Sequence, residues 1–121
     1  SVPSSGMYRF RYWSPSMAMT RQSRVLNGMG VAHGGYMATL LDAAVACAVH
    51  SLMPAGVGST TVELKVNMVR ALPVTVSPVR AIGRAIHTGR MLGTAEGRLI
   101  GPDGTLYAHA TTTCAVLHPR K

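Results

Sequence analysis

The sequence predicts an α+β fold in which one long, buried helix packs against an antiparallel sheet. Residues 31–53 form an almost unbroken apolar run that ends at Pro54, and a helix that is apolar all round is usually a buried one. After Pro54 the pattern changes to the alternation of apolar and polar residues that is typical of strands. One helix followed by several strands favours an antiparallel sheet with the helix on one face.

Two strands are expected before the helix, at residues 7–13 and, with a weaker pattern, at residues 17–25. A glycine-rich loop at residues 26–30 leads from them into the helix. Four further strands are expected after it, at residues 60–70, 78–88, 91–100 and 105–117.

The alternation in these later strands also predicts which side chains face the helix. In the strand at residues 60–70 they are Val62, Leu64, Val66 and Met68. In the last strand they are Leu106, Ala108, Ala110, Thr112, Cys114 and Val116. Gly83 indicates a bulge within residues 78–88, and the Gly101-Pro102-Asp103-Gly104 segment predicts a tight turn.

Composition and length indicate one globular domain spanning residues 1–121, since 47% of the residues are hydrophobic and 13% are charged. Asp42, His50 and two leading glycines argue against a membrane-spanning helix. Cys47 and Cys114 lie in apolar segments and are expected to be reduced core residues. With no export signal at the first residues, we expect a cytoplasmic protein.

The net charge of +8 arises because the chain has only four acidic residues. Its basic residues are scattered and aromatic residues make up only 5%, whereas nucleic-acid-binding proteins concentrate positive charge or combine it with exposed aromatics. We therefore expect a small anionic partner, such as a phosphate-bearing cofactor or carrier, and no nucleic acid or membrane.

Asp42 is the one acidic residue inside the apolar run. A carboxylate in such surroundings is a candidate functional group, although a structural hydrogen bond or an exposed polar stripe would also explain it. Gly34 and Gly35 can present backbone N–H groups at the positive end of the helix, or they can serve only for tight packing.

Five short motifs follow one another along the chain. In order they are Asn27-Gly28-x-Gly30-x-x-His33-Gly34-Gly35, Leu40-Leu41-Asp42, Thr61-Val62-Glu63-Leu64-Lys65-Val66-Asn67, Gly83-Arg84-x-Ile86-His87-x-Gly89-Arg90 and Asp103-Gly104-x-x-Tyr107-Ala108-His109-Ala110-Thr111. Over residues 27–117 this order resembles the hotdog-fold acyl-CoA thioesterases, most closely their PaaI-like (phenylacetate-degradation) branch. The resemblance implies a hotdog fold, a long central helix wrapped by an antiparallel sheet of five to six strands.

The resemblance implies hydrolysis of an acyl- or aryl-CoA thioester to free acid and coenzyme A. Asp42 would be the general base or nucleophile, and the Gly34 backbone N–H would donate to the oxyanion. Asn27 would orient the water or the thioester, and His33 would hold the loop or the substrate carbonyl. Thr61 would position the water, with Ser59 and Thr60 as competitors because loop length shifts the alignment.

The substrate-binding residues follow from the same resemblance. By this resemblance, the region that binds the phosphates and pantetheine of coenzyme A would contain Arg84, His87, Gly89 and Arg90. A solvated strand edge would explain these residues equally well. The acyl pocket would be lined by Met37, Leu40, Leu41 and Met68. Gly35 is a further substrate-binding candidate, through its backbone N–H near the carbonyl oxygen. Ala46 stands where some relatives carry Ser or Thr. No cofactor is expected, since coenzyme A is part of the substrate, and the histidines lack metal-ligand spacing.

The spacing of His33 and Asp42 bears on assembly. Nine helical residues advance about 13 Å, so the two side chains cannot meet within one helix. If they serve one site, a second copy of the chain must contribute, which makes a homodimer part of the hypothesis. The resemblance also favours a tetramer built as a dimer of dimers.

Three alternatives remain open from the sequence. A hotdog dehydratase acting on acyl carriers would need a different loop before the helix. A hotdog module that binds acyl-CoA without hydrolysing it is disfavoured by Asp42 and Asn27. A nucleic-acid-binding protein rests on the net charge alone. The acyl group is not specified by any of these residues.

Overall fold

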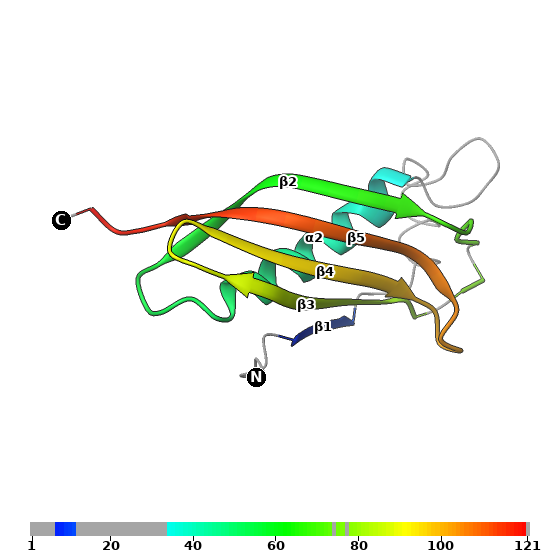
Figure 1. Cartoon of the computed structure of the whole chain (residues 1–121). Coiled ribbons are helices and arrows are strands. Elements are labelled where there is room, and N and C mark those ends of the chain that lie inside the picture. Colours follow the sequence, from blue (N-terminus) through cyan, green and yellow to red (C-terminus); the bar gives the residue numbers. More distant parts are fainter. Residues whose placement is uncertain (1–6, 12–33, 74, 77, 121) are drawn as a thin grey trace.

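The computed structural model describes residues 7–11, 34–73, 75–76 and 78–120, and these form one helix and five strands. The helix α2 spans Gly34–His50. The strands are β1 Met7–Arg11, β2 Gly58–Met68, β3 Arg80–Thr88, β4 Leu92–Ile100 and β5 Leu106–Leu117. They form one sheet in the order β1-β3-β4-β5-β2, with every neighbouring pair antiparallel (Figure 1). The predicted α+β architecture is confirmed.

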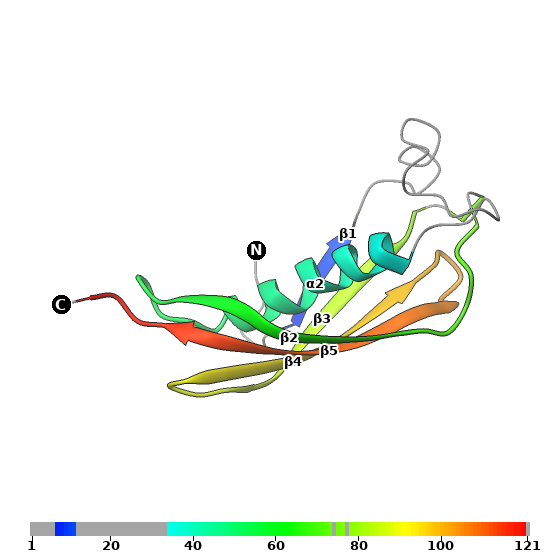
Figure 2. The same ribbon diagram turned by 90° about the horizontal axis from the view of Figure 1, so that it is seen from above.

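The helix lies along one face of this sheet (Figure 2). Its buried residues recur every three or four positions, which places them on one side; they are Met37, Leu40, Leu41, Ala44, Val45, Ala48 and Val49. The helix is therefore buried along a stripe and not all round. With 17 residues, this one helix of the described segments is too short for a membrane crossing.

The helix is shorter than its apolar run predicts. It ends at His50, and Ser51 turns away with its hydroxyl donating to the Ala48 carbonyl at 2.7 Å. Pro54 explains the early end, because it has no N–H to donate to the His50 carbonyl four residues earlier and its ring clashes with that carbonyl. The predicted strand at residues 17–25 and the start of the apolar run lie outside the described residues.

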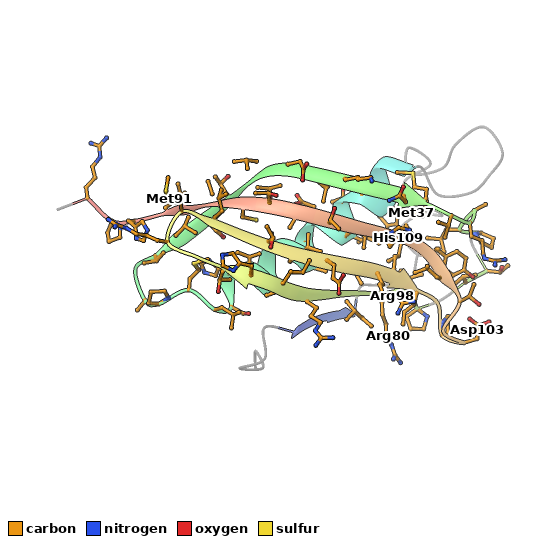
Figure 3. The ribbon with its side chains drawn as sticks, viewed as in Figure 1. Met37, Arg80, Met91, Arg98, Asp103 and His109 are labelled. Atoms are coloured by element: carbon orange, nitrogen blue, oxygen red, sulfur yellow. The ribbon has the colours of Figure 1, made fainter. Side chains whose placement is uncertain are left out.

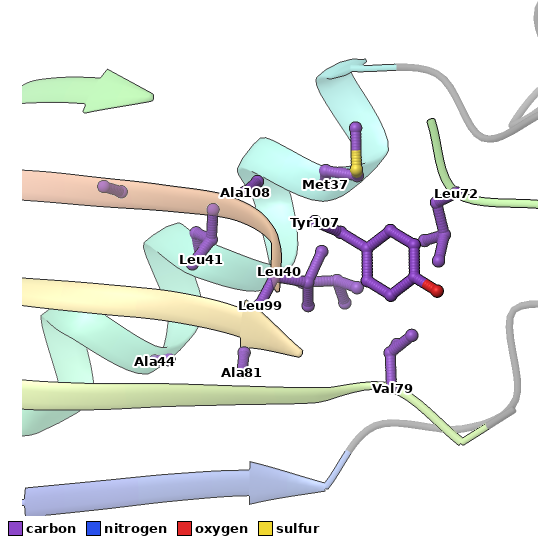
Figure 4. Close-up of a cluster of buried hydrophobic side chains, with 11 residues drawn as sticks. Met37, Leu40, Leu41, Ala44, Leu72, Val79, Ala81, Leu99, Tyr107 and Ala108 are labelled. Carbon is purple, nitrogen blue, oxygen red and sulfur yellow. The ribbon is translucent and has the colours of Figure 1, made fainter. Parts of the chain in front are cut away.

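Large side chains fill the space beside the first half of the helix (Figure 4). Leu72, Val79, Leu99 and Tyr107 are buried there against Leu40 and its helical neighbours. Farther along, small residues let the helix approach the sheet closely. A Cβ at Gly97 would lie 2.6 Å from Val45 Cγ1, and one at Gly93 would lie 2.6 Å from Val49 Cγ1.

Gly83 makes the closest of these approaches, because a Cβ there would meet the backbone carbonyl of Ala44. The prediction of a bulge at Gly83 is wrong. The β3–β4 register runs unbroken through Gly83, and the extra residue lies at Ile86, between Ala85 and His87. Gly83 is needed for helix packing, whereas the bulge lies three residues later, at Ile86.

A second bulge interrupts β2. Thr61 pairs with Cys114 and Glu63 with Thr113, so Val62 between them has no partner in β5. Val62 is 59% exposed, so the predicted helix-facing set in this strand is wrong at this position. Met68 is also exposed, but it lies on the helix side of the strand, beside Gly34. In β5 the prediction holds for Ala108, Ala110, Thr112 and Cys114, which are all buried.

The predicted turn between β4 and β5 is present. Gly104 has a φ of +85°, a conformation that favours glycine. The Thr105 backbone N–H donates to Asp103 Oδ1 at 3.0 Å. This hydrogen bond lowers the pKa of the Asp103 carboxyl from its ordinary value of 3.8. Asp103 is therefore explained by the turn and stands apart from the site described next.

Candidate active site

Asp42 lies in the middle of α2, at the border of its buried stripe. Its side chain is half-buried, while Leu41 before it is fully buried. The edge strand β2 runs beside this part of the helix. From that strand the Thr61 hydroxyl donates to Asp42 Oδ1, with 3.1 Å between the two oxygens. A hydroxyl donor on a carboxylate fixes the carboxylate's orientation.

The bulge at Val62 is the reason Thr61 can reach the helix. If the register of residues 63–68 continued without a bulge, Val62 would lie opposite Cys114 and Thr61 would face away from α2. The extra residue instead places Thr61 opposite Cys114. The sequence could not distinguish Thr61 from Ser59 and Thr60. Among these three hydroxyls, the structure shows a hydrogen bond to Asp42 only for Thr61.

This arrangement leaves an apolar side chain exposed to water. Val62 remains 59% exposed, although full burial of a valine side chain would contribute about 1.5–3 kcal/mol. A local departure from the apolar pattern, with a polar group turned inward in its place, is what functional sites commonly show. The Asp42–Thr61 pair is therefore the strongest candidate for reactive chemistry in the described part of the chain.

Two residues of β5 lie beside this pair. The buried Cys114 has its Sγ atom 3.9 Å from Thr61 Oγ1. The buried Thr112 donates its hydroxyl to the backbone carbonyl of Glu63 at 2.8 Å, directly after the bulge. The sequence pattern assigned both residues to the core face and gave neither a role. The one available signal was a hydroxyl, at Thr112, within an otherwise apolar face.

Gly34, the predicted oxyanion donor, is the first residue of α2. Eight helical residues separate it from Asp42, a rise of about 12 Å. Gly34 instead lies beside the end of β2, where a Cβ on it would meet the Met68 side chain. Asn27 and His33 lie outside the described residues. Within one chain, the structure thus does not bring Gly34 to Asp42.

The residues predicted to line the acyl pocket are mostly core residues. Met37 is 4% exposed and Leu41 is fully buried, and both pack in the cluster of Figure 4. A substrate could reach them only if neighbouring side chains moved. Gly35 is exposed, and its carbonyl accepts the Thr39 hydroxyl at 2.9 Å. Their substrate contacts stay predictions.

The predicted coenzyme A residues lie on β3 and the following hairpin. Arg84 is exposed and lies opposite Glu96 of β4 in the strand register. His87 lies opposite Thr94, on the sheet face away from the helix. The Gly89 N–H donates to the Leu92 carbonyl at 2.8 Å, which closes the hairpin, and the Arg90 carbonyl contacts His118 Nε2 at 2.7 Å. Figure 3 shows Met91 of this hairpin at the opposite end of the molecule from Met37.

The titratable side chains of the described residues form no group of three His, Cys, Asp or Glu that could hold a metal ion. The Asp42–Thr61 pair offers a carboxylate and a hydroxyl, which suit proton transfer or nucleophilic attack without further ligands. The expected absence of a cofactor stays a prediction.

Comparison with known proteins gives a family match. Residues 29–108 match the family model of the Thioesterase superfamily. A search of curated proteins finds no match.

Solved structures share the fold. A Bacillus halodurans protein solved with CoA is 27% identical, with a TM-score of 0.77 over 91% of this chain and 67% of that one. A phenylacetic acid degradation-related protein of Ralstonia eutropha JMP134 is 26% identical, with a TM-score of 0.77 over 92% and 76%. A hypothetical thioesterase of Streptococcus pneumoniae, solved with coenzyme A, is 25% identical, with a TM-score of 0.78 over 97% and 83%. The predicted hotdog fold is confirmed.

Proposed function

Because the chain belongs to the thioesterase superfamily and is thus a thioester hydrolase, we propose that its substrate is an acyl- or aryl-CoA thioester. The products are the free acid and coenzyme A. The observation that carries the proposal is the Thr61 hydroxyl on the Asp42 carboxylate. Two of the similar structures were solved with coenzyme A, which supports this substrate class.

In the proposed reaction, Thr61 occupies Oδ1 of Asp42 and leaves Oδ2 for the chemistry. As a general base, Oδ2 takes a proton from water, and the hydroxide adds to the thioester carbonyl. The C–S bond then breaks, and the departing thiolate takes up a proton. As a nucleophile, Oδ2 would itself add to the carbonyl, expel the thiolate and form an anhydride that water then hydrolyses. The Thr61 hydroxyl orients the carboxylate on either route.

The oxyanion needs a donor, and we assign the Gly34 N–H at the start of α2 to this role. Since about 12 Å of helix separates Gly34 from Asp42, the donor must come from a second copy of the chain. β2 is an edge strand of 11 residues in the described sheet, and such an edge can pair with another chain. The proposed active unit is therefore a homodimer, and a tetramer of two such dimers remains an expectation.

The decisive experiment measures release of free coenzyme A from aryl-, short-, medium- and long-chain acyl-CoA by the wild type and Asp42→Asn. We expect a fall of at least about 100-fold in the variant, the size of a lost general base. Asp103→Asn is the matched control, because Asp103 lies in an exposed turn, and it should retain activity. Unchanged turnover in Asp42→Asn would exclude the mechanism. Binding of acyl-CoA without any turnover would favour the non-catalytic binding module.

The shared site is tested by mixing two inactive variants, Asp42→Asn and Gly34→Pro. Proline is tolerated in the first turn of a helix but lacks the N–H group. Its Cβ would displace only the flexible end of the Met68 side chain, so Gly34→Pro should remove the donor and keep the fold. Hybrid dimers hold one site with both groups intact and should regain part of the wild-type activity. Fluorescence must first demonstrate that the subunits exchange. If activity then fails to recover, a site shared between chains is contradicted.

A further inference from the structure

Thr112 is the one polar residue that the structure places in the buried class among the described residues, with 2% of its surface exposed. It lies on the helix-facing side of β5, opposite Leu64. Its hydroxyl donates to the Glu63 carbonyl at 2.8 Å. The hydroxyl thus crosses from β5 to the first β2 residue that follows the bulge.

The bulge has a competing arrangement. If residues 58–61 slipped by one position, Val62 would lie opposite Cys114 and Thr61 opposite Ala115. That register would bury an apolar side chain and restore a regular ladder, both of which are favourable. It would also turn the Thr61 hydroxyl away from Asp42. Something must therefore hold the register in which Val62 is left exposed.

A side-chain donor at the bulge can do this. A bulge disrupts the backbone ladder locally, and a part-buried carbonyl beside it is stabilised by a side-chain hydrogen bond. Thr112 supplies a hydroxyl to the Glu63 carbonyl from inside the core. Cys114, two residues along the same face, contacts Thr61 through its Sγ atom. The Glu63 carbonyl, bound by Thr112, and the Thr61 hydroxyl, which faces the helix, thus lie close together on β2.

We propose that Thr112 is a positioning residue, which holds the bulge at Val62 and thereby keeps the Thr61 hydroxyl on Asp42. Thr112 acts through Thr61 and touches no substrate. The inference rests on the proposed function where turnover is the readout, and on geometry alone where the readout is a structure.

The kinetic test compares Thr112→Val with Thr61→Val and with the double variant. Thr112→Val removes the hydroxyl at nearly constant volume, and we expect kcat to fall about 10- to 100-fold, as in Thr61→Val, with KM unchanged. In the Thr61→Val background, the same substitution should cause no further loss of kcat, because Thr112 acts only through Thr61. Multiplicative losses in the double variant would overturn the proposal.

Two further variants separate positioning from simple core damage. Thr112→Ser keeps the hydroxyl and should retain kcat even if it lowers the unfolding temperature; a loss equal to that of Thr112→Val would count against the clamp. Thr113→Val removes a hydroxyl from the adjacent residue, which pairs with Glu63, and should leave kcat unchanged.

A crystal structure of Thr112→Val gives an answer independent of activity. We expect Thr61 Oγ1 to have moved out of hydrogen-bond distance of Asp42 Oδ1, and Val62 to lie opposite Cys114. An unchanged bulge with the 3.1 Å contact intact would overturn the inference. If the wild type hydrolyses no thioester, the proposed function fails, and this structure still decides whether Thr112 sets the register.

Discussion

Two of the bulges in the described sheet look alike locally and act in opposite directions. Val62 in β2 and Ile86 in β3 are the extra residues, and each is 59% exposed. The bulge in β2 turns the Thr61 hydroxyl toward the helix. The bulge in β3 places His87 opposite Thr94, on the outer face, whereas an unbroken register would have placed it opposite Gly93 beneath α2. One bulge brings a polar group to the helix, and the other removes one.

The difference shows that a bulge is best understood by the side chain that it redirects. In β2 the redirected group meets a carboxylate. In β3 the redirected imidazole joins the exposed face that also carries Arg84. If the two bulges have separate purposes, the first should serve bond breaking and the second should serve at most the binding of substrate.

The largest expected difference is kinetic. Thr61→Val should lower kcat about 10- to 100-fold with little change in KM, since hydrogen bonds to charged groups contribute about 1.5–3 kcal/mol. His87→Ala should raise KM for acyl-CoA a few-fold and leave kcat unchanged, if the outer face holds part of coenzyme A. Steady-state kinetics on both variants checks this. A fall in kcat of similar size in both would show that the two bulges do not differ in function.

The next effect concerns stability. β3 is fixed against the helix at Gly83, three residues before its bulge, because a Cβ there would meet the Ala44 carbonyl. Gly83→Ala should therefore lower the free energy of unfolding by about 1–3 kcal/mol, as overpacking does. Gly58→Ala in β2 is the matched control, since a Cβ at Gly58 meets nothing within 4 Å. Urea denaturation measures both, and equal stabilities would mean that the helix shifts freely over β3.

Much of this architecture could be predicted from the sequence. The apolar run located α2, and alternation located the four strands from β2 to β5. Alternation failed at Val62 because a regular period of two cannot register an inserted residue. The glycine in β3 led to a bulge being predicted at Gly83, because a glycine required for close packing and a glycine in a bulge look the same in sequence.

The candidate site, too, could be predicted from the sequence only in part. Asp42 stood out because it is one carboxylate in an apolar run, and the resemblance to known thioesterases added Thr61 as one of three neighbouring hydroxyls. The contact between them depends on the bulge and was not predictable from either segment alone. Thr112 acts through a backbone carbonyl, and no sequence pattern marks such a bond. Asn27 and His33 stay predictions.

The smallest expected effect tests whether the two extra residues are equivalent. In the single chain both side chains are largely exposed, so at protein concentrations where the chain is a monomer Val62→Thr and Ile86→Thr should each change the free energy of unfolding by less than about 0.5 kcal/mol. By comparison, Val45→Thr, at a fully buried position, should lower the free energy of unfolding by more than about 1 kcal/mol, because it buries an unpaired hydroxyl. Chemical denaturation at several protein concentrations measures all three.

The informative outcome is a difference between Val62 and Ile86. β2 is one of the two edge strands of the described sheet, whereas β3 lies between β1 and β4. If a second copy of the chain covers the β2 edge, Val62→Thr should become more costly than Ile86→Thr, and its cost should depend on protein concentration. Equal, concentration-independent changes would mean that no partner buries Val62, and the dimer would then have to form through another surface.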